Sequence, residues 1–212
     1  MSAILSALRR ERWAYLWLNL AYYGLVGAGM AWAAFNRPLQ EQLLTTVEGE
    51  LSAGSLAPVS AIYDRGGVLL AAAVTFGVNL VIGSLASITL PSLVVPFSGL
   101  GLAAVRAVLW GLLFAPGTLD MGGGEAVAGL SVALVVLLEG QGYVLAGLAA
   151  LVQGRAFVWP ASVGARNRRE GYAIGVGRAL TIYGAVALVL AIAALVEALA
   201  VIALMPALGL GE

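Results

Sequence analysis

The stretch "LVVLLEGQGYVLAGL", residues 134–148, decides the fold because one carboxylate, Glu139, interrupts a long apolar segment. An ionised carboxylate in a hydrocarbon environment is costly, so it should be absent, neutralised or needed for function. Small residues also recur through the stretch, and such residues allow helices to approach closely in a membrane. The segment therefore predicts a membrane helix that carries a single acidic side chain.

The composition of the whole chain agrees with a membrane location. Of 212 residues, 61% are hydrophobic and 10% are charged, and the mean hydropathy is +0.98. Soluble domains average about 45–50% apolar and about 25% charged residues. The absence of cysteine and histidine excludes disulfides, imidazole acid–base chemistry and zinc or haem sites with these ligands. We expect no cofactor and no metal, and a net charge of zero gives no general attraction to nucleic acid.

Five stretches are apolar over the length of about 20 residues that a transmembrane helix needs. The predicted fold class is all-α: a polytopic membrane protein with five transmembrane helices and a short outer interfacial amphipathic helix. The chain is expected to form one integral membrane domain over residues 1–212. The predicted spans cover approximately residues 13–35, 66–90, 96–115, 125–152 and 177–205.

Arginine placement predicts the orientation of these spans, because basic residues concentrate on the cytoplasmic side of a membrane protein. If the N-terminus is cytoplasmic, most arginines lie inside, and only Arg37 and Arg65 lie outside. An odd number of spans then places the C-terminus, Glu212, outside. We therefore expect a multi-pass protein of the cell (inner or plasma) membrane.

Two polar connections carry further predictions. In the outer connection, Leu39–Leu51 has its apolar residues at helical spacing and its glutamates on the other side, which predicts an amphipathic helix. This helix either lies on the outer membrane face or covers the bundle through protein contacts, with Leu43 and Val47 buried. The inner connection, Gln153–Arg178, is basic, and it is either a surface for anionic lipids or partners or a topology signal only.

Four polar residues fall well inside the predicted spans: Asn79, Arg106, Glu139 and Glu197. At about 1.5 Å per helical residue, the first three lie near the middle of a hydrocarbon core about 30 Å thick. Arg106 and Glu139 have opposite charges on consecutive antiparallel helices, so we predict an ion pair, with Asn79 nearby. This pair is either a static structural element or part of a proton, ion or substrate pathway. Glu197 has no obvious partner.

Glycine recurs on several predicted helices at spacings that allow close helix approach. These glycines either allow tight packing inside the bundle or form a seam for a partner subunit. The glycines singled out are Gly24, Gly27, Gly140, Gly142, Gly147, Gly171 and Gly175.

Four segments together resemble the stage II sporulation protein M family. "EGQGYVLAGLAALVQG" (Glu139–Gly154) resembles its Glu-initiated fourth-helix motif, and "VLAIAALVEALAVIALMP" (Val189–Pro206) resembles its final helix, where a Glu shortly precedes a Pro. "FGVNLVIG" (Phe76–Gly83) and "FSGLGL" (Phe97–Leu102) resemble its Asn-bearing second helix and the entry to its third. The family commonly has Pro-His-Gly before the Glu, whereas Leu134–Val136 here reads "LVV", so whatever that histidine serves is missing.

The resemblance implies a multi-pass membrane protein without known catalysis, which acts as a scaffold or as a partner of envelope machines. The leading hypothesis is therefore a non-enzymatic membrane subunit or scaffold of a cell-envelope complex. Its expected partners are other membrane proteins, in a hetero-complex or a homo-oligomer, and the lipid bilayer. The alternative is a small transport component, a permease partner or carrier that uses the Arg106/Glu139 region. A polar cavity that reaches Arg106 would favour transport, whereas co-purification with a stoichiometric partner and the absence of a midplane cavity would favour a scaffold.

Overall fold

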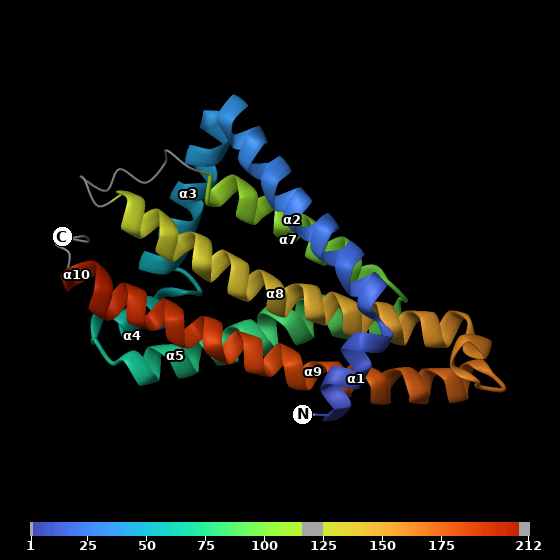
Figure 1. The fold of residues 1–212 in the computed structure, drawn as a ribbon. Coiled ribbons are helices and arrows are strands. Elements are labelled where there is room, and N and C mark those ends of the chain that lie inside the picture. Colours follow the sequence, from blue (N-terminus) through green and yellow to red (C-terminus); the bar gives the residue numbers. More distant parts are fainter. Residues whose placement is uncertain (1, 116–124, 208–212) are drawn as a thin grey trace.

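The computed structural model describes residues 2–115 and 125–207, which are helical and contain no strand (Figure 1). Most elements are α-helices, η1 and η3 are π-helical, and η2 is a 3₁₀ turn. In chain order they are α1 (Ser2–Arg10), α2 (Arg12–Phe35), α3 (Arg37–Ser52), α4 (Ala57–Asp64), α5 (Val68–Gly77), η1 (Val78–Thr89), α6 (Leu90–Val94), α7 (Ser98–Leu113), α8 (Glu125–Val158), η2 (Pro160–Val163), α9 (Arg168–Leu199), η3 (Ala200–Leu204) and α10 (Met205–Ala207).

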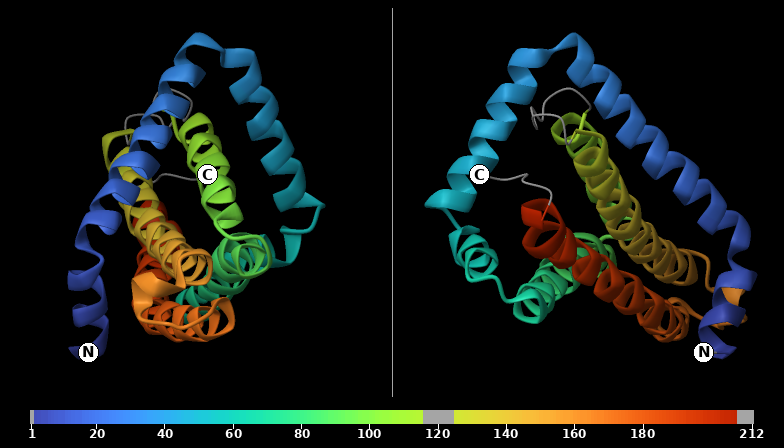
Figure 2. Two further views of the ribbon diagram at one scale, coloured as in Figure 1. Left: turned by 90° about the vertical axis from the view of Figure 1, so that its right-hand side faces the viewer. Right: turned by 60° about the vertical axis from the view of Figure 1, so that its left-hand side comes forward.

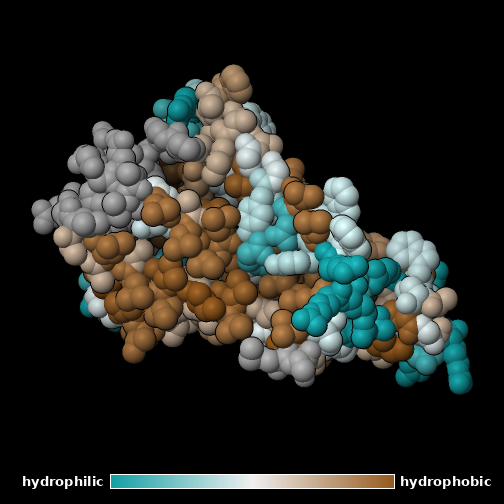
Figure 3. All heavy atoms as spheres, viewed as in Figure 1, coloured by the Kyte–Doolittle hydropathy of each residue, from teal (hydrophilic) through white to brown (hydrophobic). Residues whose placement is uncertain are grey.

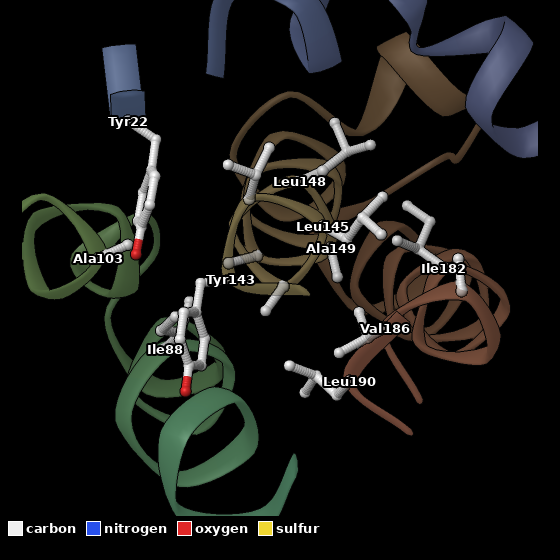
Figure 4. Packing of buried hydrophobic residues seen from close by; sticks show 14 of the residues in the cluster. Tyr22, Ile88, Ala103, Tyr143, Leu145, Leu148, Ala149, Ile182, Val186 and Leu190 are labelled. Carbon is white, nitrogen blue, oxygen red and sulfur yellow. The ribbon is translucent and has the colours of Figure 1, made fainter. Parts of the chain in front are cut away.

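Helices α8 and α9 form the centre of the bundle and run side by side (Figure 1). Figure 4 shows Val186 and Leu190 of α9 directed toward Leu145 and Ala149 of α8, and all four side chains are buried. Gly142 of α8 lets Leu190 approach, because a side chain at this position would collide with it. In a membrane such close packing, rather than exclusion of water, drives helix association.

Helices α2 and α7 cross at two glycines. A Cβ on Gly29 would collide with the backbone carbonyl of Val108, and a Cβ on Gly111 would collide with that of Val26. Backbone atoms cannot rotate away as a side chain can, so glycine is required at both positions. This contact attaches α2 to the bundle along much of its length (Figure 1).

The segment from Val68 to Val94 is one continuous helical rod whose middle part, η1, has π-helical hydrogen bonding. Such i→i+5 bonding is rare and usually limited to single turns, often at functional sites. Within it, the hydroxyls of Ser84 and Ser87 donate to the carbonyls of Leu80 and Gly83, each at 2.6 Å. These bonds satisfy both hydroxyls inside an apolar helix.

By length and composition, three helices of the described residues are able to cross a membrane, and not five as the sequence predicted. They are Val68–Val94, Gly129–Val158 and Arg168–Leu204. The predicted span over residues 13–35 is helical as α2, but its Trp, Tyr, Asn and Gly residues lower its hydropathy. The predicted span over residues 96–115 forms α7, whose 16 residues are shorter than the roughly 20 that a span needs. The predicted outer C-terminus, Glu212, lies outside the described residues.

Helix α3 forms where the sequence predicts an amphipathic helix. It begins at Asn36, whose side-chain oxygen accepts a hydrogen bond from the Leu39 backbone N–H at 3.4 Å, and it diverges from α2 in a V (Figure 2). Leu39 and Leu43 pack against Ala33 and Leu112 in a small cluster of their own. These contacts support the interpretation that the first half of α3 covers the bundle.

The junction between α1 and α2 is attached to the far end of α8 by an ion pair. The Arg155 guanidinium donates to both carboxylate oxygens of Glu11, each at 2.8 Å. The Glu11 side chain is only 8% exposed, and a carboxylate is stable in such a place only when it is paired. Arg155, which the sequence assigned to the connection after the fourth predicted span, thus lies within α8 and contributes to the packing of the N-terminal helices.

Candidate functional site

An open cavity of about 350 Å³ lies between α4, the α5–η1 rod, α8 and α9. Its walls combine apolar residues with a polar set that comes from every one of these elements. The polar residues that line it are Ser60, Tyr63, Thr75, Asn79, Glu139 and Glu197.

Glu139 of α8 and Glu197 of α9 both line this cavity and lie close enough for each carboxyl group to affect the charge of the other. Glu139 is 6% exposed, and one oxygen of Glu197 is buried without a hydrogen-bond partner. Two carboxylates held together away from water repel each other, so a cation, of which the proton is the smallest, stabilises the pair. The sequence pointed to both residues but left Glu197 without a partner.

Tyr63 covers the pair from α4. Its hydroxyl is 2.7 Å from the Thr75 hydroxyl, and its side chain lines the cavity beside Glu197. Burial raises the pKa of Tyr63 to about 12, so this phenol keeps its proton at physiological pH and remains available as a donor. Sequence reasoning missed Tyr63 and Thr75, since neither stands out in its own segment.

Asn79 connects the carboxyl pair to a second group of residues. Its side-chain amide donates to Glu139 Oε1 at 2.6 Å, and its carbonyl oxygen accepts from the Tyr143 hydroxyl at 3.0 Å. The Arg106 guanidinium lies over the Tyr143 ring, 4.4 Å from its centroid, and donates to the Ser87 hydroxyl at 3.4 Å. Arg106, Tyr143, Asn79 and Glu139 therefore form a chain of contacts from α7 through η1 to α8.

The predicted direct ion pair between Arg106 and Glu139 is wrong: no ion pair joins these two side chains in the structure. The reason is Tyr143, which lies one helical turn after Glu139 on the same face of α8. Its ring takes the Arg106 guanidinium, and its hydroxyl reaches Glu139 only through Asn79 (Figure 4 shows the direction of Tyr143 from α8). Asn79, Arg106 and Glu139 nevertheless lie in one region, as the sequence suggested, and Glu197 lies there as well.

A separate polar network joins α2 to α8 and was not predicted. Tyr15, Asn19 and Tyr23 follow one another at intervals of four on α2, and all three contact the Gln141 side chain. Tyr23 also donates to the Leu137 carbonyl at 2.7 Å. The spacing of these residues on α2 was the signal that could have found the network.

The predicted glycines divide into two groups. Gly140, Gly142, Gly171 and Gly175 are packing positions, because an added Cβ would collide with a neighbouring helix. A Cβ on Gly147 would make only an ordinary contact, 3.5 Å from Leu100. Gly24 and Gly27 face open space, so in this chain alone they contact no other helix.

Glu197 also lines a second cavity, of about 210 Å³, and Val201 lines both cavities as well. The remaining walls of the second cavity are almost entirely apolar and come from α7, α8 and η3. The Glu197 carboxyl group therefore lies between a polar cavity and an apolar one.

Comparison of the chain with family models, with curated proteins and with solved structures finds no match in any of the three.

Proposed function

We propose that this chain is a non-enzymatic integral membrane component of a transport system, in which Glu139 and Glu197 bind and release a proton. The observation that carries the proposal is that two carboxyl groups from different helices, Glu139 and Glu197, line one open cavity. Ionisable residues within membrane helices are expensive and mark proton or ion pathways more often than static structure. The three apolar helices support the membrane assignment, and the cell membrane with a cytoplasmic N-terminus is part of the proposal.

The chemistry of the site favours a proton over a metal ion. Among the described residues, no group of three or more acidic side chains lies together to hold a metal. The Asn79 amide group donates to Glu139, and its carbonyl oxygen accepts from the Tyr143 hydroxyl. Because this oxygen is already engaged, Asn79 is a poor ligand for a cation. Two carboxyl groups that share one proton remove the repulsion between them without further ligands.

Carbodiimide labelling tests this proposal, because an apolar carbodiimide reacts with protonated carboxyl groups in low-polarity sites. We expect mass spectrometry to find the label on Glu139 or Glu197 at neutral pH and not on the exposed Glu41. Glu197→Gln should lower the labelling of Glu139, since the remaining carboxyl group no longer shares a proton with a neighbour. Labelling of neither residue in the folded protein would contradict the proposal.

Proton movement is the second test. The protein, purified in mild detergent with any partners that remain attached, is placed in vesicles that contain a pH-sensitive dye. Glu139→Gln and Glu197→Gln should each abolish the pH-driven flux, whereas the matched control Glu48→Gln, on the exposed side of α3, should retain it. Equal flux in all three variants would exclude the carboxyl pair from the pathway.

A scaffold of the kind implied by the resemblance to stage II sporulation protein M is the second candidate. It is supported by the open face of α2, where Gly24 and Gly27 meet no neighbour and where Trp17 and Leu20 are exposed. Gly24→Leu should release a bound partner protein without lowering thermal stability, as measured by co-purification and mass spectrometry. If the Gly24→Leu variant retains every partner protein, this face of α2 does not serve as a scaffold surface.

A further inference from the structure

A second polar cavity, of about 200 Å³, lies in the groove between α1 and α9. Its polar lining consists of Ser6, Arg10, Glu11, Arg178 and Thr181. Hydrophilic side chains gather on this part of the surface, beside the apolar face formed by the rest of α9 (Figure 3). The groove therefore lies at a boundary between a basic surface and an apolar one.

The charge balance of this cavity leaves two guanidinium groups uncompensated. Glu11, the carboxylate in its wall, is already paired through both oxygens with Arg155. No acidic side chain of the described residues pairs with Arg10 or Arg178. Two guanidinium groups beside two hydroxyls are well suited to a phosphate group, because each guanidinium offers a planar fork of donors.

An exposed apolar stripe continues from the cavity along α9. Leu188, Ile192 and Leu195 follow Thr181 at intervals that keep them on one helix face, and they are 58%, 47% and 41% exposed. At about 1.5 Å per residue, Ile192 lies roughly 16 Å from Thr181, close to the thickness of one leaflet of the hydrocarbon core. A molecule with a phosphate at one end and an acyl chain at the other matches both features.

We propose that the groove between α1 and α9 binds an anionic phospholipid, with its phosphate between Arg10 and Arg178 and an acyl chain along Leu188 and Ile192. The site is separate from the carboxyl pair, so it does not rest on the proposed transport function. Its position where α1 meets α9 means that a bound lipid contacts both helices. The lipid would therefore strengthen the attachment of the N-terminal helix.

Native mass spectrometry of the protein purified from phosphatidylglycerol/phosphatidylcholine nanodiscs tests the site. The wild-type protein should retain phosphatidylglycerol in preference to phosphatidylcholine. Arg10→Gln and Arg178→Gln should each lower this retention about fivefold, the scale of one basic residue at an anionic surface, and Arg178→Lys should retain most of it. Arg65→Gln, which removes an arginine far from the groove, is the matched control and should retain the lipid as the wild-type protein does.

Thermal unfolding in detergent distinguishes a lipid from a free anion. Added phosphatidylglycerol should raise the Tm of the wild-type protein and not that of the Arg10→Gln/Arg178→Gln double variant. Stabilisation by inorganic phosphate without stabilisation by phosphatidylglycerol would overturn the lipid assignment. Equal lipid retention by the double variant and the wild-type protein would overturn the site itself.

Discussion

The Arg106 guanidinium lies over the ring of Tyr143, 4.4 Å from its centroid, and not against the carboxylate of Glu139. A cation over an aromatic face contributes about 0.5–2 kcal/mol, with the larger values at desolvated sites. A double-mutant cycle of Arg106→Leu and Tyr143→Leu should therefore give a coupling of about this size in the free energy of unfolding in detergent. The cycle of Arg106→Leu and Glu139→Gln should give a smaller coupling. A larger coupling between Arg106 and Glu139 than between Arg106 and Tyr143 would instead support a direct ion pair.

Gly29 and Gly27 provide a matched pair of substitutions on α2. Gly29→Ala places a methyl group against the Val108 carbonyl and should cost about 1–3 kcal/mol, the range for overpacked interiors. Gly27→Ala meets open space and should be neutral or stabilise the helix by about 0.5–1 kcal/mol. Chemical unfolding in detergent measures both. Equal effects of the two substitutions would show that α2 and α7 are not in close contact.

The Glu11–Arg155 pair should contribute measurably to stability. Either Glu11→Gln or Arg155→Gln leaves a partly buried charge without its partner, and each should lower the free energy of unfolding by about 1.5–3 kcal/mol. Arg65→Gln, which breaks no ion pair, is the control and should change it little. If Glu11→Gln lowers the free energy of unfolding no more than Arg65→Gln does, the pair is only a surface contact.

The hydrogen bonds of the Glu50 carboxylate predict how the stability of the turn after α3 depends on pH. The backbone N–H and hydroxyl of Ser55 both donate to its carboxylate, and they lower the pKa of Glu50. Because the pKa is lower in the folded state, these bonds stabilise the turn after α3 above the ordinary glutamate pKa and are lost as the pH falls through the lowered value. NMR titration of Glu50 should show its pKa rise in Ser55→Ala and not in Ser52→Ala. An unchanged pKa in Ser55→Ala would contradict the bonding.

Much of the helical pattern could be predicted from the sequence. Apolar runs bounded by proline or glycine predict the rod that begins at Val68 and the helices around Glu139 and Glu197, because only the local hydropathy and the breakers decide them. The helix over Leu39–Leu51 could be predicted from its spacing. The π-helical bonding of η1 could not, since its sequence resembles that of an ordinary apolar helix.

Contacts between helices were harder to predict than the helices themselves. Depth along each span suggested that Arg106 faces Glu139, but depth says nothing about how each helix is rotated about its own axis. That rotation brings Glu197 to Glu139 and places Tyr143 beside Arg106. Because the close packing of α8 on α9 sets the rotation, it depends on the whole interface and not on either segment alone.

The Glu11–Arg155 pair also has a consequence for biosynthesis, because it joins residues separated by 144 positions. At roughly 5–20 residues per second, the ribosome needs about 7–30 s after making Glu11 before Arg155 exists. The helix most buried in the finished protein, α8, emerges in the same late interval. The Glu11–Arg155 link between the N-terminal helices and α8 can thus form only after most of the chain has been made, later than the contact between α2 and α7.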